Sequence, residues 1–144
     1  MINTGLLTAQ IIMAFKNSGV LVGDGIAPSG GGWLSGQPNV SVFVPYGTVV
    51  GTGATTPETS FKYADQIKTW DVSYKLSTFG GSREQCDWAS YKLRDTVGDC
   101  LGQEFGEYLV QMVSWRQLGP LIRNDSVDPP MWSVSDLFVL RCSA

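Results

Sequence analysis

Two pairs of carboxylates have spacings at which acid–base catalysis or weak cation binding could occur. Asp95 and Asp99 are one helical turn apart, and Asp125 and Asp128 share a loop. The 144-residue chain has no histidine, so the usual general base and the commonest metal ligand are missing. Like charges at i, i+4 are ordinary on exposed helices. Solvated surface is therefore the favoured interpretation, and an enzyme of unknown chemistry that relies on Asp or Glu is the alternative.

The chain has three cysteines. Cys86 and Cys100 are fourteen residues apart on one predicted helix. Their separation of about 21 Å, at 1.5 Å per residue, is beyond disulfide reach. Cys142 ends an apolar strand. No C-x-x-C spacing occurs, so no zinc site is predicted. All three side chains are expected to pack as small hydrophobes in a protein of a reducing compartment.

Two glycine clusters could cradle a phosphate group. Neither Gly23-Asp24-Gly25 nor Gly51-Thr52-Gly53 completes a dinucleotide-binding G-x-G-x-x-G motif or a Walker motif with its lysine. Both are interpreted as turns. We therefore expect no catalytic residue, no cofactor and no bound metal.

Charge and composition exclude several classes of partner. The ten basic and thirteen acidic residues are interspersed, with a formal net charge of -3, so no basic patch for nucleic acid or an anionic membrane is predicted. No apolar run reaches the roughly 18 residues of a transmembrane helix, and the N-terminal residues do not resemble a signal peptide, so cytosolic synthesis is expected. Four aromatic residues are assigned to core packing rather than base stacking, namely Trp70, Tyr74, Trp88 and Tyr91.

A strand–turn–helix unit from Lys68 to Leu101 organises the predicted fold. Apolar side chains occupy alternate positions over 69–78, which is typical of a half-buried strand. After Gly80-Gly81, Ser82 and Gln85 form a capping box in which the glutamine reaches back to the serine amide. The helix that follows has an apolar stripe at three- and four-residue steps, formed by Cys86, Ala89, Leu93, Val97 and Cys100.

One helix and two or three strands are predicted before this unit. An apolar stripe predicts a helix from Thr4 to Phe15 that stops at Asn17-Ser18-Gly19. A short strand follows over 20–22, and a β-rich run over 39–50 contains Pro45, which indicates a sheet edge or a bulge. The segment 51–66 is interpreted as a long loop, either a binding loop or a disordered one.

Two strands are predicted after the helix. The first covers 108–118, with Leu109, Val113 and Trp115 on one face and Val110 and Met112 on the other. The second covers 132–142, after a connection over 119–130. The predicted fold class is α+β, a single domain over 1–144 with a mixed, mainly antiparallel sheet of about five strands and two helices packed on one face. Because both faces of the last strands are apolar, another copy of the chain is expected to cover the open face.

Four segments between Val20 and Cys142 carry a resemblance to a known family. They are Val22-Gly23-Asp24-Gly25 with Pro28 and Gly32-Trp33; Val42-Phe43-Val44-Pro45-Tyr46; Trp70 to Tyr74 running into Phe79-Gly80-Gly81-Ser82-Arg83; and Asp128-Pro129-Pro130-Met131-Trp132 before the last strand. Together they resemble the tail terminator proteins of long-tailed, siphovirus-type bacteriophages.

The resemblance implies an assembly role without catalytic residues. Members of the family have a mixed sheet with helices on one side and form a ring, usually a hexamer, at the head-proximal end of the tail tube. The ring ends tail polymerisation and provides the surface that joins the head connector. The implied partners are other copies of the chain, the tail tube protein and the head–tail connector protein, without a membrane. DNA is expected to pass through the lumen without specific binding, since a mildly acidic wall would not grip it.

The expected location is the head-proximal end of the tail in the virion, after assembly in the host cytoplasm. Nine residues are expected to contact other copies or partners: Trp33, Tyr46, Thr55, Glu58, Phe61, Tyr63, Arg116, Arg123 and Asp125. Two further alternatives stay open beside the enzyme. One is a head-completion or neck protein of the same virion, and the other is a small monomeric binding module that uses the loop over 51–66.

Overall fold

Two long strands form the centre of the sheet because their apolar and polar residues alternate. In the computed structural model, β5 (Thr69–Gly80) pairs antiparallel with β9 (Met131–Ser143) along its whole length. The strands predicted over 69–78 and 132–142 are therefore confirmed. The structure describes residues 4–33, 43–55, 69–99, 103–105, 108–126 and 130–143.

Further strands extend the sheet on both sides of this pair. β4 (Tyr46–Thr55) pairs antiparallel with β5, and β1 (Leu21–Asp24) pairs parallel with β4. On the other side, β7 (Tyr108–Gln117) pairs with β9, and β6 (Gln103–Phe105) with β7. β8 (Ile122–Asn124) also pairs with β9. The strand order is β1-β4-β5-β9-β7-β6, so β1 and the β7–β8 segment lie on opposite sides of the sheet.

The predicted mixed, mainly antiparallel sheet is confirmed, but it has seven strands rather than about five. The sequence pattern missed β6 and β8 because three residues are too few to show a period. It also missed β2 (Gly32–Trp33), which pairs with β3 (Phe43–Val44) in a separate two-stranded sheet, although β3 lies within the β-rich run predicted over 39–50.

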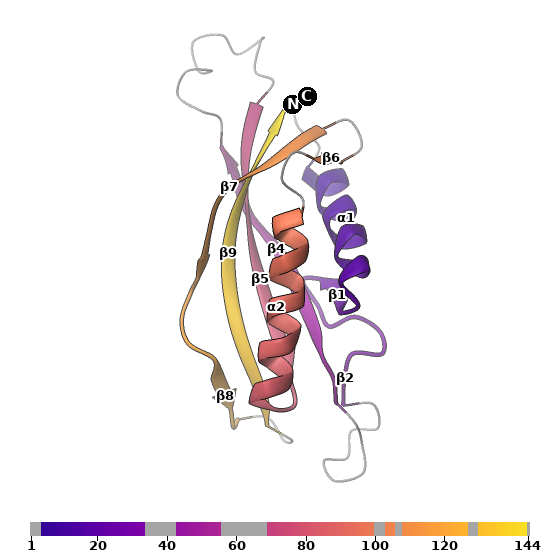
Figure 1. Ribbon diagram of the computed structural model, residues 1–144, viewed down its shortest axis with the longest axis vertical. Coiled ribbons are helices and arrows are strands. Elements are labelled where there is room, and N and C mark those ends of the chain that lie inside the picture. Colours follow the sequence, from indigo (N-terminus) through magenta and orange to yellow (C-terminus); the bar gives the residue numbers. More distant parts are fainter. Residues whose placement is uncertain are drawn as a thin grey trace.

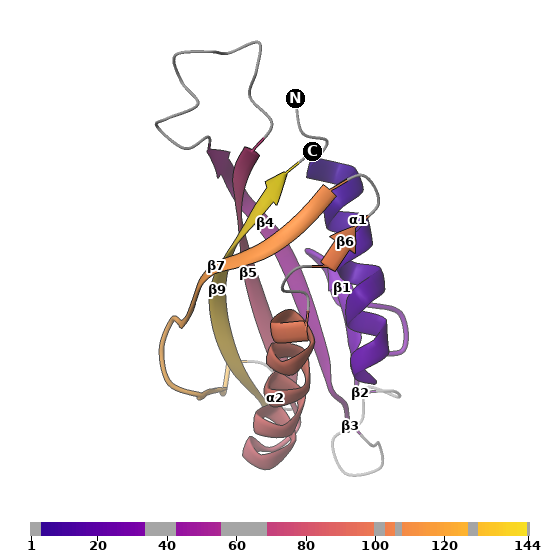
Figure 2. The same cartoon turned by 45° about the horizontal axis from the view of Figure 1, so that its top comes forward.

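Both helices cover the same face of the sheet, as predicted (Figures 1 and 2). α1 (Thr4–Phe15) lies at the β1 side and contacts β1, and α2 (Arg83–Asp99) crosses β5, β9 and β4. A short 3-10 helix, η1 (Lys16–Ser18), follows α1 and ends at Gly19, which adopts the left-handed conformation at φ 82°. The helices and the sheet share one apolar core, to which α1 contributes Leu7, Ile11 and Phe15.

The start of α2 is fixed by its cap and by a close approach to β5. The Gln85 backbone amide donates to Ser82 Oγ at 3.2 Å, as predicted. The Gln85 side chain, however, accepts from the Gly81 amide at 2.8 Å rather than from the serine amide. A Cβ atom on Gly80 would lie 2.5 Å from the Cys86 nitrogen, so only glycine lets the helix fold back this tightly.

The prediction for Pro45 is wrong, and the loop predicted over 51–66 is wrong for residues 51–55. Pro45 lies neither at a sheet edge nor in a bulge, because it separates β3 from β4, which belong to different sheets. The segment from Gly51 is not all loop, since β4 continues to Thr55 with a bulge between Gly51 and Gly53. The rest of that predicted loop lies outside the described residues.

A bulge also changes the predicted faces of β7. The register shifts between Met112 and Ser114, so Trp115 pairs with Phe138 on the helix-covered face. The sequence predicted that Trp115 and Val110 lie on opposite faces of the sheet. They share one face, because the extra residue of the bulge inverts the alternation of side chains after it.

No helix covers the other face of the sheet in the described part of the chain. On that face Arg141 forms an ion pair with Asp71 at 2.8 Å, and the Ser77 and Ser135 hydroxyls form a hydrogen bond at 3.1 Å. Leu137 and Val139 are half-buried between these polar groups. The face is therefore less apolar than the sequence run over 137–140 indicated.

Candidate functional site

The two described cysteine side chains, Cys86 and Cys142, are buried. Burial raises the pKa of each thiol to about 11, because the apolar core solvates a thiolate poorly. Both thiols therefore stay protonated and unreactive at neutral pH. This agrees with the packing role that was predicted, and Cys100 lies outside the described residues.

The carboxylate pairs considered from the sequence are only partly described. Asp95 and Asp125 are exposed, and Asp125 forms an ion pair with Arg123 at 2.8 Å. The side chain of Asp99 and the whole of Asp128 lie outside the described residues. Among the residues that are described, no group of three or more acidic or thiol side chains could hold a metal ion.

A buried carboxylate that the sequence reasoning overlooked lies on the helix-covered side of β9. Asp136 has no exposed surface. Arg94 of α2 donates to both of its oxygens, from Nε at 2.9 Å and from Nη2 at 3.1 Å. This bidentate pair holds α2 against β9. The sequence did contain an indication of this site, because the alternation Val134, Asp136, Phe138 places a charged residue among the inward-facing residues of the strand.

The same arginine reaches the β7 side of the sheet. Its Nη2 also donates to Gln117 Oε1 at 3.2 Å, and its guanidinium lies 5.2 Å from the centroid of the Trp115 ring. Its Nη1 forms no hydrogen bond with any described residue. The Arg94 side chain is 25% exposed, so part of it is accessible from outside the chain.

Exposed large apolar side chains gather on opposite sides of the molecule. One group lies on β7 and the segment after β7: Leu109, Val113, Trp115, Leu118 and Ile122, while Trp88 and Tyr91 lie on α2. The other group lies on α1, β1 and the turn after β1: Leu6, Met13, Leu21 and Ile26. Val50 on β4 lies close to the turn after β1, since a Cβ atom on Gly25 would be 3.9 Å from its Cγ2 atom. Grouping of this kind marks interaction surfaces, whereas scattered exposed residues do not.

Two aromatic residues assigned to the core from the sequence are on the surface. Trp88 is 48% exposed and Tyr91 is 62% exposed. The core prediction is wrong for them because they fall outside the buried stripe of α2. Tyr91 is three residues from both Trp88 and Arg94, so the three side chains follow one ridge of the helix. Trp, Tyr and Arg are the residue types most enriched in interface hot spots.

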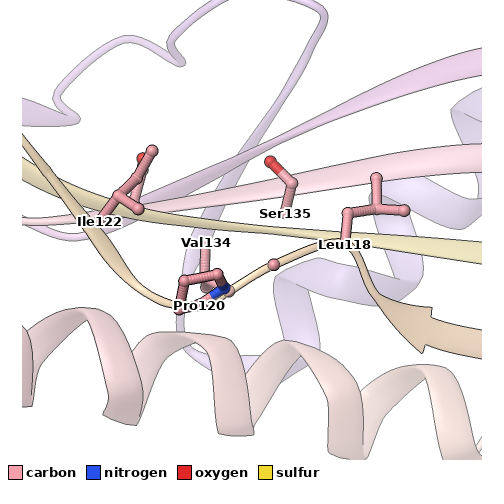
Figure 3. A pocket seen from close by; sticks show the side chains of 7 residues that line it. Leu118, Pro120, Ile122, Val134 and Ser135 are labelled. Carbon is pink, nitrogen blue, oxygen red and sulfur yellow. The ribbon is translucent and has the colours of Figure 1, made fainter.

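The β7–β8 side of the sheet is hollowed, as Figure 3 shows. β7 stops pairing with β9 after Gln117, and β8 rejoins β9 at Ile122. The turn between them leaves a pocket of about 250 Å³. Its lining is mainly apolar and consists of Leu118, Gly119, Pro120, Ile122, Ser133, Val134 and Ser135. A pocket of this lining suits an aliphatic side chain.

The opposite side presents a protruding apolar residue. Among the described residues, β1 pairs only with β4. Leu21 on β1 is 41% exposed, and Ile26 in the following turn is 75% exposed, the largest value for a large apolar residue in the described ranges. Asp24 at the end of β1 is exposed and has no ion-pair partner among the described residues.

Three of the predicted contact residues are exposed near the hollowed side. Arg116 lies on β7, Arg123 lies on β8, and Asp125 follows β8. Arg116 pairs with Leu137 on the face without helices. These three are thus close to the pocket, although the apolar residues that line it were not predicted.

Tyr46 has a different environment from the other predicted contact residues. It is buried and stacks between Phe43 and Phe79, with centroid separations of 6.1 and 4.9 Å. Its ring is therefore packed within its own chain.

The remaining predicted contact residues are described partly or not at all. The backbones of Trp33 and Thr55 belong to β2 and β4, and their side chains lie outside the described part. Glu58, Phe61 and Tyr63 lie outside the described residues altogether.

Comparisons with known proteins give no match, either to a family model or to a curated protein. None of the helices in the described ranges combines the length and the apolar character that crossing a lipid bilayer requires.

Proposed function

We propose that this protein is a structural component of a bacteriophage tail. It forms a ring at the head-proximal end of the tail tube, ends polymerisation of the tube and provides the surface that joins the head connector. The observation that carries this proposal is that exposed apolar residues lie at two dissimilar, opposite sides of one sheet: Leu21 and Ile26 at the β1 side, and Leu118 and Ile122 at the β7–β8 side. A cyclic ring uses two such surfaces on every subunit, one for each neighbour.

The fold and the described polar groups are compatible with this role. Two helices on one face of a mixed, mainly antiparallel sheet is the arrangement that the family resemblance implies. Cys86 and Cys142 are protonated at neutral pH, and Asp136 is paired with Arg94. These buried groups thus support packing, and the exposed apolar sides are free for assembly.

Electron microscopy of tail tubes tests the proposal. Tubes assembled from the other tail proteins in the absence of this protein should be longer than normal and should lack a defined end. Addition of the purified full-length chain should place one ring on one end only and should stop growth. Binding along the whole tube, or no binding, would contradict the proposal. A ring found on the head connector with normal tail length would indicate a head-completion or neck protein instead.

A further inference from the structure

Residue pairing places β1 level with the pocket on the opposite side of the sheet. One row of paired residues runs Leu21, Tyr46, Phe79, Ser133, Ile122. A second row runs Asp24, Val49, Leu76, Asp136, Gln117. The four residues of β1 and the segment 117–122 therefore occupy the same rows.

The faces of the sheet match as well as the rows, because directly paired residues share a face. Leu21 and Ile122 lie on the face without helices. Gly23 is linked by pairing through Thr48 and Ser77 to Ser135, so it lies on the face without helices. The carbonyl oxygen of Ile26 covers Gly23 on that face, so Ile26 lies there too. Asp24 shares the helix-covered face with Asp136 and hence with the Arg94 guanidinium.

Strand directions favour contact between the two sides. β1 is parallel to β4, and each pairing from β4 to β7 is antiparallel, so β1 and β7 run in opposite directions. Copies placed side by side in one orientation would bring β1 of one copy beside the β7–β8 side of the next in antiparallel alignment. Rows and faces are preserved in that arrangement.

We propose that Leu21 and Ile26 of one copy insert between Leu118, Pro120 and Ile122 of the next copy, while Asp24 of the first forms an ion pair with Arg94 of the second. This interface rests on the proposed ring and specifies which surfaces form it.

The volume of the pocket and the charges beside it both support a second copy of the chain as the partner. The pocket of about 250 Å³ is several times the ~30 Å³ that one water molecule occupies in the liquid. It therefore accommodates an aliphatic side chain, and Ile26 is the most exposed large apolar residue in the described ranges. The charges are complementary, because Asp24 has no ion-pair partner and Arg94 Nη1 has no acceptor among the described residues. A guanidinium nitrogen and a carboxylate form a strong, charge-assisted hydrogen bond.

Disulfide trapping in the full-length chain tests the contact directly. The double variant Leu21→Cys/Ile122→Cys, oxidised mildly at high protein concentration, should give a ladder of cross-linked species that ends at one closed ring, because Leu21 and Ile122 occupy the same row and face. The native Cys86 and Cys142 are buried, and the unmodified chain, which also contains Cys100, is the background control for all three native thiols. Each single variant should give no ladder, because a ring contact joins residue 21 of one copy to residue 122 of another.

A charge exchange tests the complementarity of the two sides. Ile26→Asp alone and Ile122→Lys alone should each weaken self-association about tenfold or more, since an apolar contact is replaced by an unpaired charge. An equal mixture should restore assembly, because alternating copies pair Asp with Lys at every second interface and keep the native contact at the others. Lys75→Asp is the control, as Lys75 is exposed at the centre of the sheet on β5, which is paired on both sides. It should assemble like the unmodified chain.

The outcomes separate this interface from the proposed function. If rings form on tail ends but Ile26→Asp still assembles and no cross-link appears, the interface is wrong and the ring proposal stands. If the chain remains monomeric on tails and at the highest soluble concentration, with no cross-link, the interface is wrong and the ring proposal falls with it. Folding of each variant is checked by its denaturation midpoint, which substitution at exposed positions should leave unchanged.

Discussion

At the scale of single residues, the Arg94–Asp136 pair is the charged contact on which stability depends most. Asp136 has no exposed surface, and each of its carboxylate oxygens accepts a charge-assisted hydrogen bond from the guanidinium of Arg94. A buried pair gives little net stability over an apolar pair, but removal of one partner leaves a charge without solvent or counter-ion.

Substitution of Arg94 by alanine should therefore lower the free energy of unfolding by about 3–5 kcal/mol. The measurement is chemical denaturation followed by tryptophan fluorescence. Arg123→Ala is the matched control, because Arg123 and Asp125 form a pair whose side chains are 55% and 70% exposed. The control should change stability by less than about 0.5 kcal/mol. Equal losses in the two variants would contradict the structural role of the buried pair.

The buried thiols make stability depend on pH in the alkaline range. Cys86 and Cys142 ionise near pH 9 when exposed, and burial raises the pKa of each to about 11 in the folded chain. The unfolded state therefore loses these protons first, so stability is complete below about pH 9 and falls as the pH rises toward about 11. Burial also raises the pKa of Tyr46 and Tyr74, in the same direction.

Denaturation curves across this range should show the loss. The variant Cys86→Ala/Cys142→Ala should show a smaller slope of stability against pH than the unmodified chain, although its stability at neutral pH is lower. An identical slope in both proteins would show that the two thiols do not titrate as described.

At the scale of elements, the sequence predicted long periodic segments well and short or irregular ones poorly. α2, β5 and β9 were correctly placed because many residues repeat one period. β6 and β8 were missed, since three residues show no period. Trp115 was assigned to the wrong face because a bulge depends on pairing with β9 rather than on the sequence of β7.

The close approach of α2 to β5 leads to a prediction at this scale. Gly80→Ala should destabilise the protein by about 1–3 kcal/mol through overpacking, because the added Cβ would lie 2.5 Å from the Cys86 nitrogen. Gly119→Ala is the control, since its Cβ would meet nothing within 4 Å. Thermal or chemical denaturation measures both. A Gly80 variant as stable as the control would show that α2 can shift away from the strand without cost.

At the scale of the whole molecule, the candidate surfaces could not be predicted from the sequence. Trp88 and Tyr91 were assigned to the core, and Ile26 and Ile122 were not singled out from the sequence. Their arrangement depends on the sheet, which brings residues more than a hundred positions apart into one row, as with Leu21 and Ile122. Row membership depends on pairing between distant strands, which periodicity does not reveal.

Hydrogen exchange should detect the difference between the edges and the centre of the sheet. Backbone amides of β5 should be well protected in the isolated chain, because β5 is paired on both sides. Amides of β1 and of the segment 117–124 should exchange faster and should become protected when copies associate. Protection that appears on β5 alone, with the edges unchanged, would contradict edge-to-edge association.

The two sides of the sheet differ, so a subunit can be damaged at one of them and remain intact at the other. A chain with Ile26→Asp still offers the pocket formed by Leu118, Pro120 and Ile122. Such a chain would bind to a growing assembly through its pocket, but its altered β1 side would not bind the next copy. Small amounts of this variant, expressed together with the unmodified protein, should therefore reduce the fraction of closed rings by more than the variant's share of the total protein.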